Sequence, residues 1–168
     1  ARPTKENPSA LAKLHVKKIP QDYAERAVLV GVKRPNQQWP TESSLAELER
    51  LAQTAGAEVV ATTFQRLESP NPRTFIGSGK VDEVAQLCRS YAADLVIFDD
   101  ELTPSQQSNL EKQVGKDIKI IDRTALILDI FALHATSREG RLQVRLAQNE
   151  YLLPRLRGMW AHLASNRM

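Results

Sequence analysis

The chain has 168 residues, 42% of them apolar, and its 23 Lys and Arg against 20 Asp and Glu give a formal net charge of +3. This length is enough for one buried core with an appendage. No apolar run approaches the roughly 18 residues that span a bilayer, and no signal peptide is visible. The only cysteine, Cys88, excludes an internal disulfide and a cysteine-based zinc site, and it favours a reducing, cytoplasmic location.

The small net charge hides a segregation along the chain. Residues 1–20 hold five Lys or Arg against one Glu, residues 21–122 hold eleven bases against sixteen acids, and residues 123–168 hold seven Arg against three acids. We expect residues 1–20 to form a mobile basic leader. Arginine suits bidentate contact with phosphate better than lysine does, so the basic C-terminal part indicates a polyanionic partner, most often nucleic acid.

Residues 21–122 alternate apolar runs with helical patterns. A strand is predicted at 27–32, then a helix entered through a capping box of Ser44 and Glu47 and ended by Gly56, and a second strand at 58–64. A helix at 81–92 precedes a strand at 94–98. Thr103 and Gln106 then predict the capping box of a helix that stops at Gly115, before a fourth apolar run at 118–121. Because the strands are apolar rather than alternating, this pattern predicts an α/β subdomain with a small parallel sheet and flanking helices.

Residues 123–158 predict a C-terminal antiparallel helical hairpin. Leu126, Ile130 and Leu133 mark the first helix, and the second carries a repeat at steps of four and three: Leu142, Leu146, Asn149, Leu153 and Leu156. Asn149 is expected in the seam, and Pro154 must kink or stop the helix. The break of about six residues puts an arginine-rich loop at the tip, with Gly140 turning at positive φ. The candidate nucleic-acid contacts are Thr136, Ser137, Arg138, Glu139, Gly140 and Arg141, with Arg145 one turn further on. Plain solvated charge is the alternative explanation of such a tip.

Two other segments contain residue types that are found in binding sites. Gly77, Ser78, Gly79 and Lys80 form a glycine-rich turn before a helix, which favours a weak anion site at most, because Thr74 and Val81 break the phosphate-loop motif. Asp99, Asp100 and Glu101 follow a strand, where a Mg²⁺ site is conceivable but solvated acids are more common. His15, His134 and His162 show no metal spacing. These residues predict no metal site and no catalytic site.

Three blocks of the sequence carry a family resemblance: RTFIGSGKVDEV, DLVIFDDELTPSQQSNLE and IIDRTALILDIFALHATSREGRLQVRLAQNEYLLPRLRGMW. Together they resemble the N-terminal region of the HflX family of ribosome-associated GTPases. The resemblance implies a domain that docks on the large ribosomal subunit, reaches rRNA near the peptidyl transferase centre with its hairpin loop, and serves in ribosome splitting or rescue.

The same resemblance implies that residues 159–168 begin a linker to a GTPase domain that this chain lacks. GTP and Mg²⁺ are then cofactors of a longer parent, with none expected in this chain, and the parent's own GTPase domain is a second partner. Two alternatives remain at this point. In the first, the chain is an intramolecular regulatory module that controls the GTPase domain; exposed Leu or Ile on the hairpin would favour this alternative. In the second, it is a weak nucleotide-binding domain that uses the turn at Gly77–Lys80.

Overall fold

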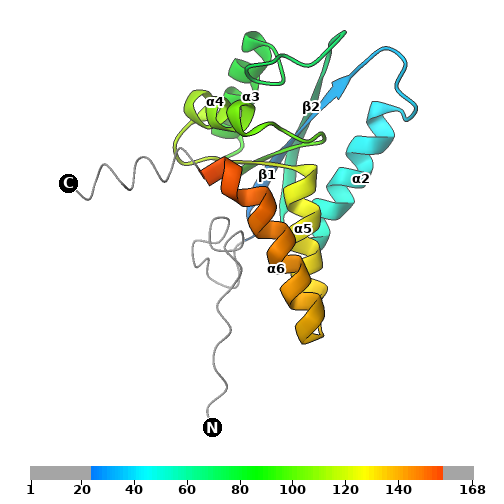
Figure 1. Cartoon of the computed structure of the whole chain (residues 1–168). Coiled ribbons are helices and arrows are strands. Elements are labelled where there is room, and N and C mark those ends of the chain that lie inside the picture. Colours follow the sequence, from blue (N-terminus) through cyan, green and yellow to red (C-terminus); the bar gives the residue numbers. More distant parts are fainter. Residues whose placement is uncertain (1–23, 157–168) are drawn as a thin grey trace, which may run out of the picture.

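The computed structural model of the chain describes residues 24–156, so the predicted leader (1–20) and linker (159–168) lie outside the described residues. Four strands form one sheet in the order β2-β1-β3-β4, and every neighbouring pair is parallel (Figure 1). Their bounds are β1 (Arg26–Lys33), β2 (Glu58–Arg66), β3 (Leu95–Phe98) and β4 (Lys119–Asp122). The predicted α/β fold with a small parallel sheet is confirmed.

Strand β1 lies in the middle of the sheet and is buried on both faces. Because successive side chains of a strand point to opposite faces, its odd and even positions join different cores. Val28, Val30 and Val32 pack in the core beneath α3 (Ser78–Ser90) and α4 (Pro104–Val114), whereas Ala27 and Leu29 pack in the core beneath α2 (Thr41–Thr54) and α5 (Arg123–His134). The continuous apolar run that predicted this strand is therefore explained by cover on both sides.

The helix ends show which local signals decide where a helix begins. The capping box of Thr103 and Gln106 is confirmed, and α4 ends at Val114, directly before Gly115, whose φ of 145° suits glycine. The predicted box of Ser44 and Glu47 is wrong, because α2 begins at Thr41 with no side-chain cap. Pro40 sets the start instead, since its ring fixes φ, and its carbonyl accepts the N–H of Ser44 at 3.1 Å.

The segment between β2 and α3 is held rigidly by local hydrogen bonds. The Asn71 side chain accepts from the N–H of Arg73 at 2.8 Å, and Asn71 and Phe75 exchange backbone hydrogen bonds. Gln106 of α4 donates to the Asn71 carbonyl at 2.9 Å. Phe75 adopts a φ of 64°, which is rare for a bulky residue, and its ring meets that of Phe98 edge-on at 6.2 Å. The packing of Phe75 in the core thus holds an unfavourable backbone conformation.

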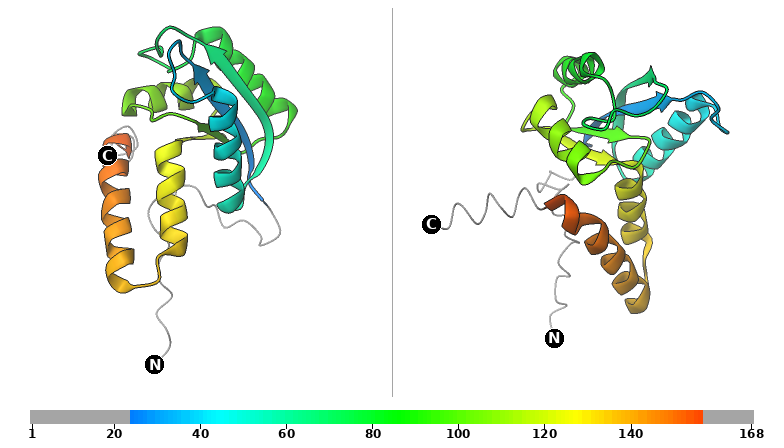
Figure 2. Two further views of the ribbon diagram at one scale, coloured as in Figure 1. Left: turned by 90° about the vertical axis from the view of Figure 1, so that its right-hand side faces the viewer. Right: turned by 45° about the horizontal axis from the view of Figure 1, so that its top comes forward.

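Helix α5 starts where β4 ends, and its far end projects beyond the sheet. Helix α6 (Arg138–Leu152) returns towards the sheet and continues into the short 3₁₀ turn η1 (Leu153–Leu156). The two helices lie side by side in both views of Figure 2. We call residues 123–156 the arm and residues 24–122 the body. Pro154 lies in η1, so the prediction that the helix kinks or stops there is confirmed. Among residues 24–156, no helix is long and apolar enough to cross a membrane.

Candidate nucleic-acid interface

The tip of the arm is tighter than the sequence predicted. Only residues 135–137 connect α5 to α6, and the residues from Arg138 to Arg141 form the first turn of α6 rather than a loop. Ser137 caps that turn, since its hydroxyl oxygen accepts the N–H of Gly140 at 3.0 Å. The prediction that Gly140 turns at positive φ is wrong, because the residue is helical. A side-chain cap, not a glycine turn, shapes the tip.

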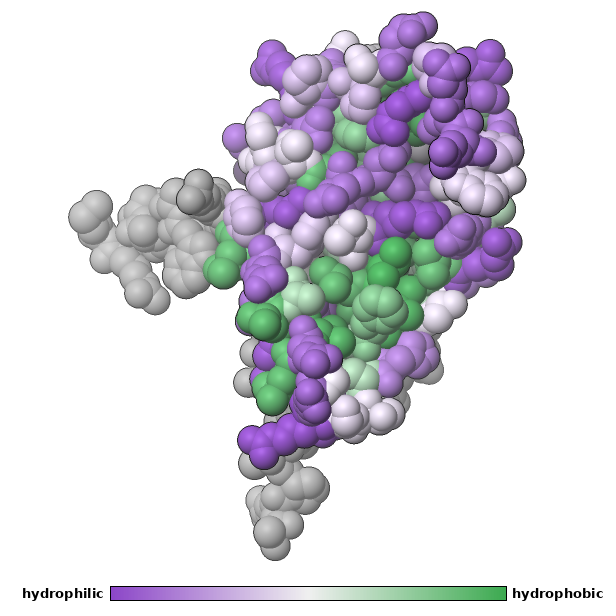
Figure 3. Space-filling model, turned by 45° about the vertical axis from the view of Figure 1, so that its right-hand side comes forward, coloured by the Kyte–Doolittle hydropathy of each residue, from purple (hydrophilic) through white to green (hydrophobic). Residues whose placement is uncertain are grey.

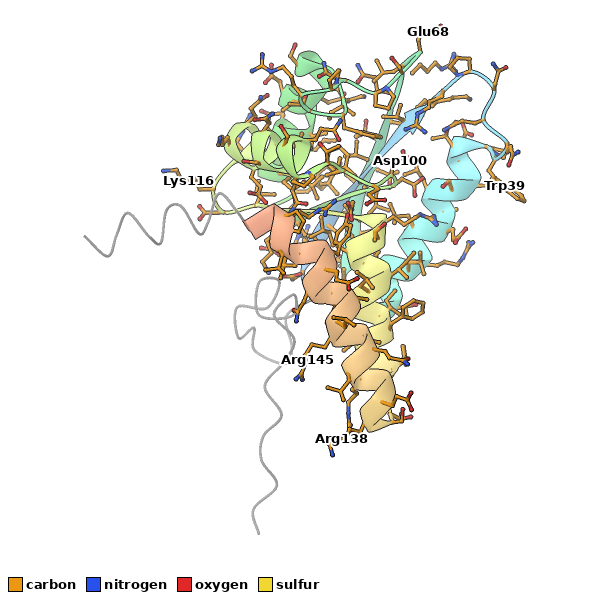
Figure 4. All side chains as sticks on the ribbon, viewed as in Figure 1. Trp39, Glu68, Asp100, Lys116, Arg138 and Arg145 are labelled. Atoms are coloured by element: carbon orange, nitrogen blue, oxygen red, sulfur yellow. The ribbon has the colours of Figure 1, made fainter. Side chains whose placement is uncertain are left out.

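The arginines of the tip all face solvent. Arg138, Arg141 and Arg145 are exposed, and their spacing of three and four residues puts them on one side of α6. In Figure 4, Arg138 extends from the far end of the arm, and Arg145 projects from the flank of α6. Thr136, Ser137 and Glu139 are exposed as well, whereas Gly140 is half-buried. The structure thus brings the predicted contact residues together at the end of a projecting pair of helices.

The face by which α6 packs against α5 differs from the predicted seam. Gln148 and Leu152 are its buried residues, and the Gln148 amide donates to Asp129 of α5 at 3.4 Å. Asn149, predicted in the seam, is exposed, and so are Leu142, Leu146 and Leu153 of the same repeat. The apolar repeat is real, but it lies on the outer side of the helix. Sequence alone does not say which of two neighbouring stripes faces the partner helix.

The base of the arm is fixed by Asp122, whose role the sequence analysis missed. This fully buried residue ends β4 and caps α5, accepting the N–H groups of Leu102 and Ala125, each at 2.9 Å. The Tyr151 hydroxyl of α6 donates to the same carboxylate. One side chain thereby joins the sheet, the β3–α4 loop and both helices of the arm. An Asp directly before an apolar helical pattern is an N-cap signal that could have revealed it.

Arg155 completes this junction. Its guanidinium stacks on the Tyr151 ring at 3.6 Å and donates to the carbonyls of Tyr151 at 2.8 Å and Leu102 at 2.5 Å. Burial raises the pKa of Tyr151 well above its usual range, and the hydrogen bond to Asp122 raises it further. The tyrosine therefore remains protonated and continues to donate, so the arm is fastened to the body at its base.

Two polar groups of the glycine-rich turn are engaged within the protein. Helix α3 begins at Ser78, directly after Gly77, whose N–H is already donated to the Gln65 side chain at 2.9 Å. The Lys80 ammonium lies 2.5 Å from Glu83 and 3.0 Å from the Thr63 hydroxyl. The Gly77 N–H and the Lys80 ammonium thus already have partners within the protein. Ser78 and Gly79 lie in the same first turn of α3 and add no cation.

The acids after β3 each face an arginine. Asp99 lies 3.1 Å from Arg123, and Asp100 lies 3.5 Å from Arg34. Burial raises the pKa of Asp100, and the charge of Arg34 opposes this shift. Within residues 24–156, no group of three or more His, Cys, Asp or Glu could hold a metal ion. The acids contribute to a network of ion pairs at the carboxyl edge of the sheet.

Two family models match the chain when it is compared with known proteins. A family model described as GTP-binding GTPase N-terminal matches residues 42–132, and one described as GTP-binding GTPase Middle Region matches residues 134–168. The boundary between the two matches falls at the end of α5. The first match thus covers the chain from α2 to α5, without β1, and α6 lies in the second match.

Several relatives share the name GTPase HflX. The one from Flavobacterium psychrophilum is 50% identical over 83% of this chain and 33% of its own length. Those from Alkalihalophilus pseudofirmus and Escherichia coli K12 are 51% and 40% identical over 83% and 84% of this chain, and over 33% and 32% of their own lengths. The chain therefore spans about a third of the length of the curated relatives that it matches.

Solved structures share the fold. A mutation variant of SsGBP superposes with a TM-score of 0.65 at 25% identity, over 80% of this chain and 42% of that one. A GTP-binding protein from the archaeon Sulfolobus solfataricus, in complex with GDP, gives a TM-score of 0.61 at 24% identity, over 85% of this chain and 42% of that one. Fold and matched regions together define the N-terminal part of a GTP-binding protein. More specifically, the chain belongs to the HflX family of GTPases and corresponds to its N-terminal region.

Proposed function

We propose that this chain is the ribosome-binding region of an HflX-type GTPase, and that its arm is an antiparallel helical hairpin that docks on the large ribosomal subunit. In this proposal the tip, residues 136–141 with Arg145, reaches rRNA near the peptidyl transferase centre. The observation that carries the proposal is the cluster of exposed arginines at the far end of the arm. The family membership supports it.

The shape of the arm suits contact with folded RNA. Helix α6 has 15 residues, and at 1.5 Å of rise per residue this corresponds to a length of about 22 Å. Such an arm carries Arg138 and Arg141 away from the body, whose residues 24–122 have more acids than bases and would be repelled by phosphate. The arginines pair with phosphates and release counterions, so the affinity falls as salt concentration rises. Folded RNA is read here by backbone and shape rather than by base sequence.

The remaining steps belong to the full-length parent. There, GTP and Mg²⁺ occupy the GTPase domain. Binding of the N-terminal region to the ribosome changes the state of that domain, and the two act together in ribosome splitting or rescue. The junction at Asp122 and Tyr151 supports this transmission, because it ties the arm to the carboxyl edge of the sheet. Because its proposed partner is the ribosome, the protein is expected to act in the cytoplasm.

The test is co-sedimentation of the 168-residue protein with purified large subunits across a salt series, with small subunits as the reference. We expect saturable binding to large subunits only. Arg138→Ala together with Arg141→Ala should weaken it and lower the slope of log affinity against log salt by roughly two, one unit for each phosphate contact.

A matched control removes the same charge from the body. Arg50 and Arg73 are exposed there, so Arg50→Ala with Arg73→Ala tests net charge without touching the tip. Equal weakening by both double variants would reduce the effect to bulk electrostatics and contradict the proposal. So would unchanged binding of the tip variant, provided that its circular dichroism melt matches that of the parent chain.

A further inference from the structure

The side of α5 that faces away from α6 carries uncovered apolar side chains. Asp129 faces α6, since it accepts from the Gln148 amide. Ile127 and Phe131 lie about 160° around the helix from it. Phe131 is 56% exposed, and Ile127 and Leu128 are half-buried. Figure 3 shows apolar side chains gathered below the middle of the molecule, towards the arm. We call Ile127, Leu128 and Phe131 the outer face of α5.

The outer face lies near the point where the chain enters the body. All four strands are parallel, so the first residues of β1, β3 and β4 lie at one edge of the sheet. Helix α5 runs back towards this edge. From Arg123 to Phe131 it rises about 12 Å, close to the roughly 10 Å that β4 spans in the opposite direction. In the left view of Figure 2, β1 begins level with the lower half of α5. Residues 1–23 therefore join the body near Phe131.

The sequence before the body contains a short stretch that suits an apolar surface. Residues 10–19 read ALAKLHVKKI, between Pro8 and Pro20, and we call them the leader segment. The larger apolar side chains of this segment are Leu11, Leu14, Val16 and Ile19, and its cations are Lys13, Lys17 and Lys18. A leader that only meets phosphate needs the lysines but not the apolar side chains. The composition therefore favours a protein surface that is both apolar and acidic.

The body supplies the acids beside the outer face of α5. Arg123, one turn before Ile127, lies 3.3 Å from Glu47 of α2, so α2 flanks this face. The charged residues of α2 are Glu42, Glu47, Glu49 and Arg50. Residues 1–20 hold five Lys or Arg against one Glu, whereas residues 24–122 hold eleven Lys or Arg against fifteen Asp or Glu. The leader and the surface next to α5 thus have complementary charge.

We propose that the leader segment docks on the outer face of α5, with its apolar side chains on Phe131 and its lysines towards α2. Only residues 20–23 separate the segment from the described chain, so its effective concentration at this face is high. A second copy or a separate protein lacks this advantage. For residues 10–19 the proposal replaces the expectation of a mobile leader, and it gives α5 the cover that its apolar composition requires.

Hydrogen exchange of the 168-residue protein tests this proposal. Leu11→Asp with Leu14→Asp removes two apolar contacts of the leader segment. Residues 127–134 should then exchange faster by about fivefold or more, because α5 opens more readily once the segment has left it, while exchange in the four strands stays unchanged. The reciprocal variant Phe131→Ser should accelerate exchange in residues 10–19.

Each variant has a matched control. Thr4→Asp with Asn7→Asp adds the same negative charge to the leader outside the segment, and should leave exchange in α5 unchanged. Leu133→Ser removes a leucine that is 66% exposed on the same helix, about 160° around it from Phe131. This second control should leave exchange in residues 10–19 unchanged.

Unchanged exchange of α5 in the variant with Leu11→Asp and Leu14→Asp would overturn the proposal. So would equal acceleration by the control with Thr4→Asp and Asn7→Asp, because charge alone would then account for the effect. Protection of α5 that falls when the unmodified chain is diluted would assign the outer face to a second copy instead. Since no ribosome is present, failure here leaves the proposed binding of the tip to rRNA untouched.

Discussion

The body and the arm differ sharply in how they bury apolar side chains. Of the buried hydrophobic residues in the described chain, only Ala125, Leu126 and Leu152 belong to the arm. The arm nevertheless supplies most of the large exposed hydrophobics: Phe131, Leu133, Leu142, Leu146 and Leu153. Helix α5 is apolar almost all round, a composition typical of helices that are covered on every side. The body buries most of its own apolar side chains, whereas the arm carries apolar surface that it does not bury itself.

The largest effect should come from a matched pair of leucines, one in each region. Leu48 on α2 is fully buried, so Leu48→Ala should lower the free energy of unfolding by about 3–5 kcal/mol through lost burial and a cavity. Leu146→Ala on α6 should change it by no more than about 0.5 kcal/mol. Urea unfolding of the 168-residue protein measures both. Similar losses for the two variants would mean that the outer side of α6, where Leu146 lies, is already packed in this chain.

The next effect concerns the junction between the regions. Asp122→Ala leaves the N–H groups of Leu102 and Ala125 and the Tyr151 hydroxyl without their acceptor, and should cost about 3 kcal/mol. Tyr151→Phe removes one of these bonds and should cost about 1 kcal/mol. Hydrogen exchange should then show faster exchange in α6 for Tyr151→Phe, with the strands unchanged. Uniform acceleration across strands and arm would show that the two regions open as one unit.

A smaller effect compares the two helix caps that are made by hydroxyl groups. Thr103 begins α4 in the body and Ser137 begins α6 in the arm, and each accepts a backbone N–H at its helix start. Alanine at either position should cost about 1 kcal/mol of local helix stability. For Thr103→Ala we expect the loss to appear in the urea midpoint. For Ser137→Ala we expect it mainly as faster exchange in the first turn of α6, and a full loss in the midpoint would contradict this separation.

The smallest effect is the pH dependence that Cys88 contributes to the body. Its folded pKa of about 11 lies above the unfolded value of 9.0, so the unfolded chain loses the thiol proton first. This contribution to stability is complete below pH 9.0 and falls as pH rises towards about 11. Urea midpoints at about pH 8 and about pH 10.5 should therefore drop less in Cys88→Ala than in the unmodified chain. An equal drop would mean that the thiol ionises alike in both states.

The sequence predicted the body well because several local signals agree there. The apolar run of β1, the capping box at Thr103 and the stop at Gly115 each specify the same element that the core then buries. The start of α2 was predicted wrongly because Ser44 and Glu47 match the pattern of a capping box, whereas the helix begins three residues earlier, at Thr41, without a side-chain cap.

The arm was harder to predict because its apolar residues do not define one face. The repeat through Leu142 and Leu146 suggested the packed side, but Gln148 and Leu152 occupy it. The contacts of Asp122, Tyr151 and Arg155 join residues up to 53 positions apart, as Arg155 to Leu102 illustrates, and no spacing rule reveals them. At the tip, the sequence predicted the candidate contact residues. It did not predict that Arg138 to Arg141 form the first turn of a helix, which the Ser137 cap begins.

That cap places Arg138 and Arg141 in the first turn of a helix, where the macrodipole is positive. Cations there are unfavourable by about 0.3–1 kcal/mol each, and Glu139 is the one acid of that turn. In the free arm these charges oppose the helix that displays them. A bound polyanion reverses the balance, since it neutralises the arginines and the helix end together. The end of the arm should therefore gain helical order as it binds, so that its stiffness depends on its partner.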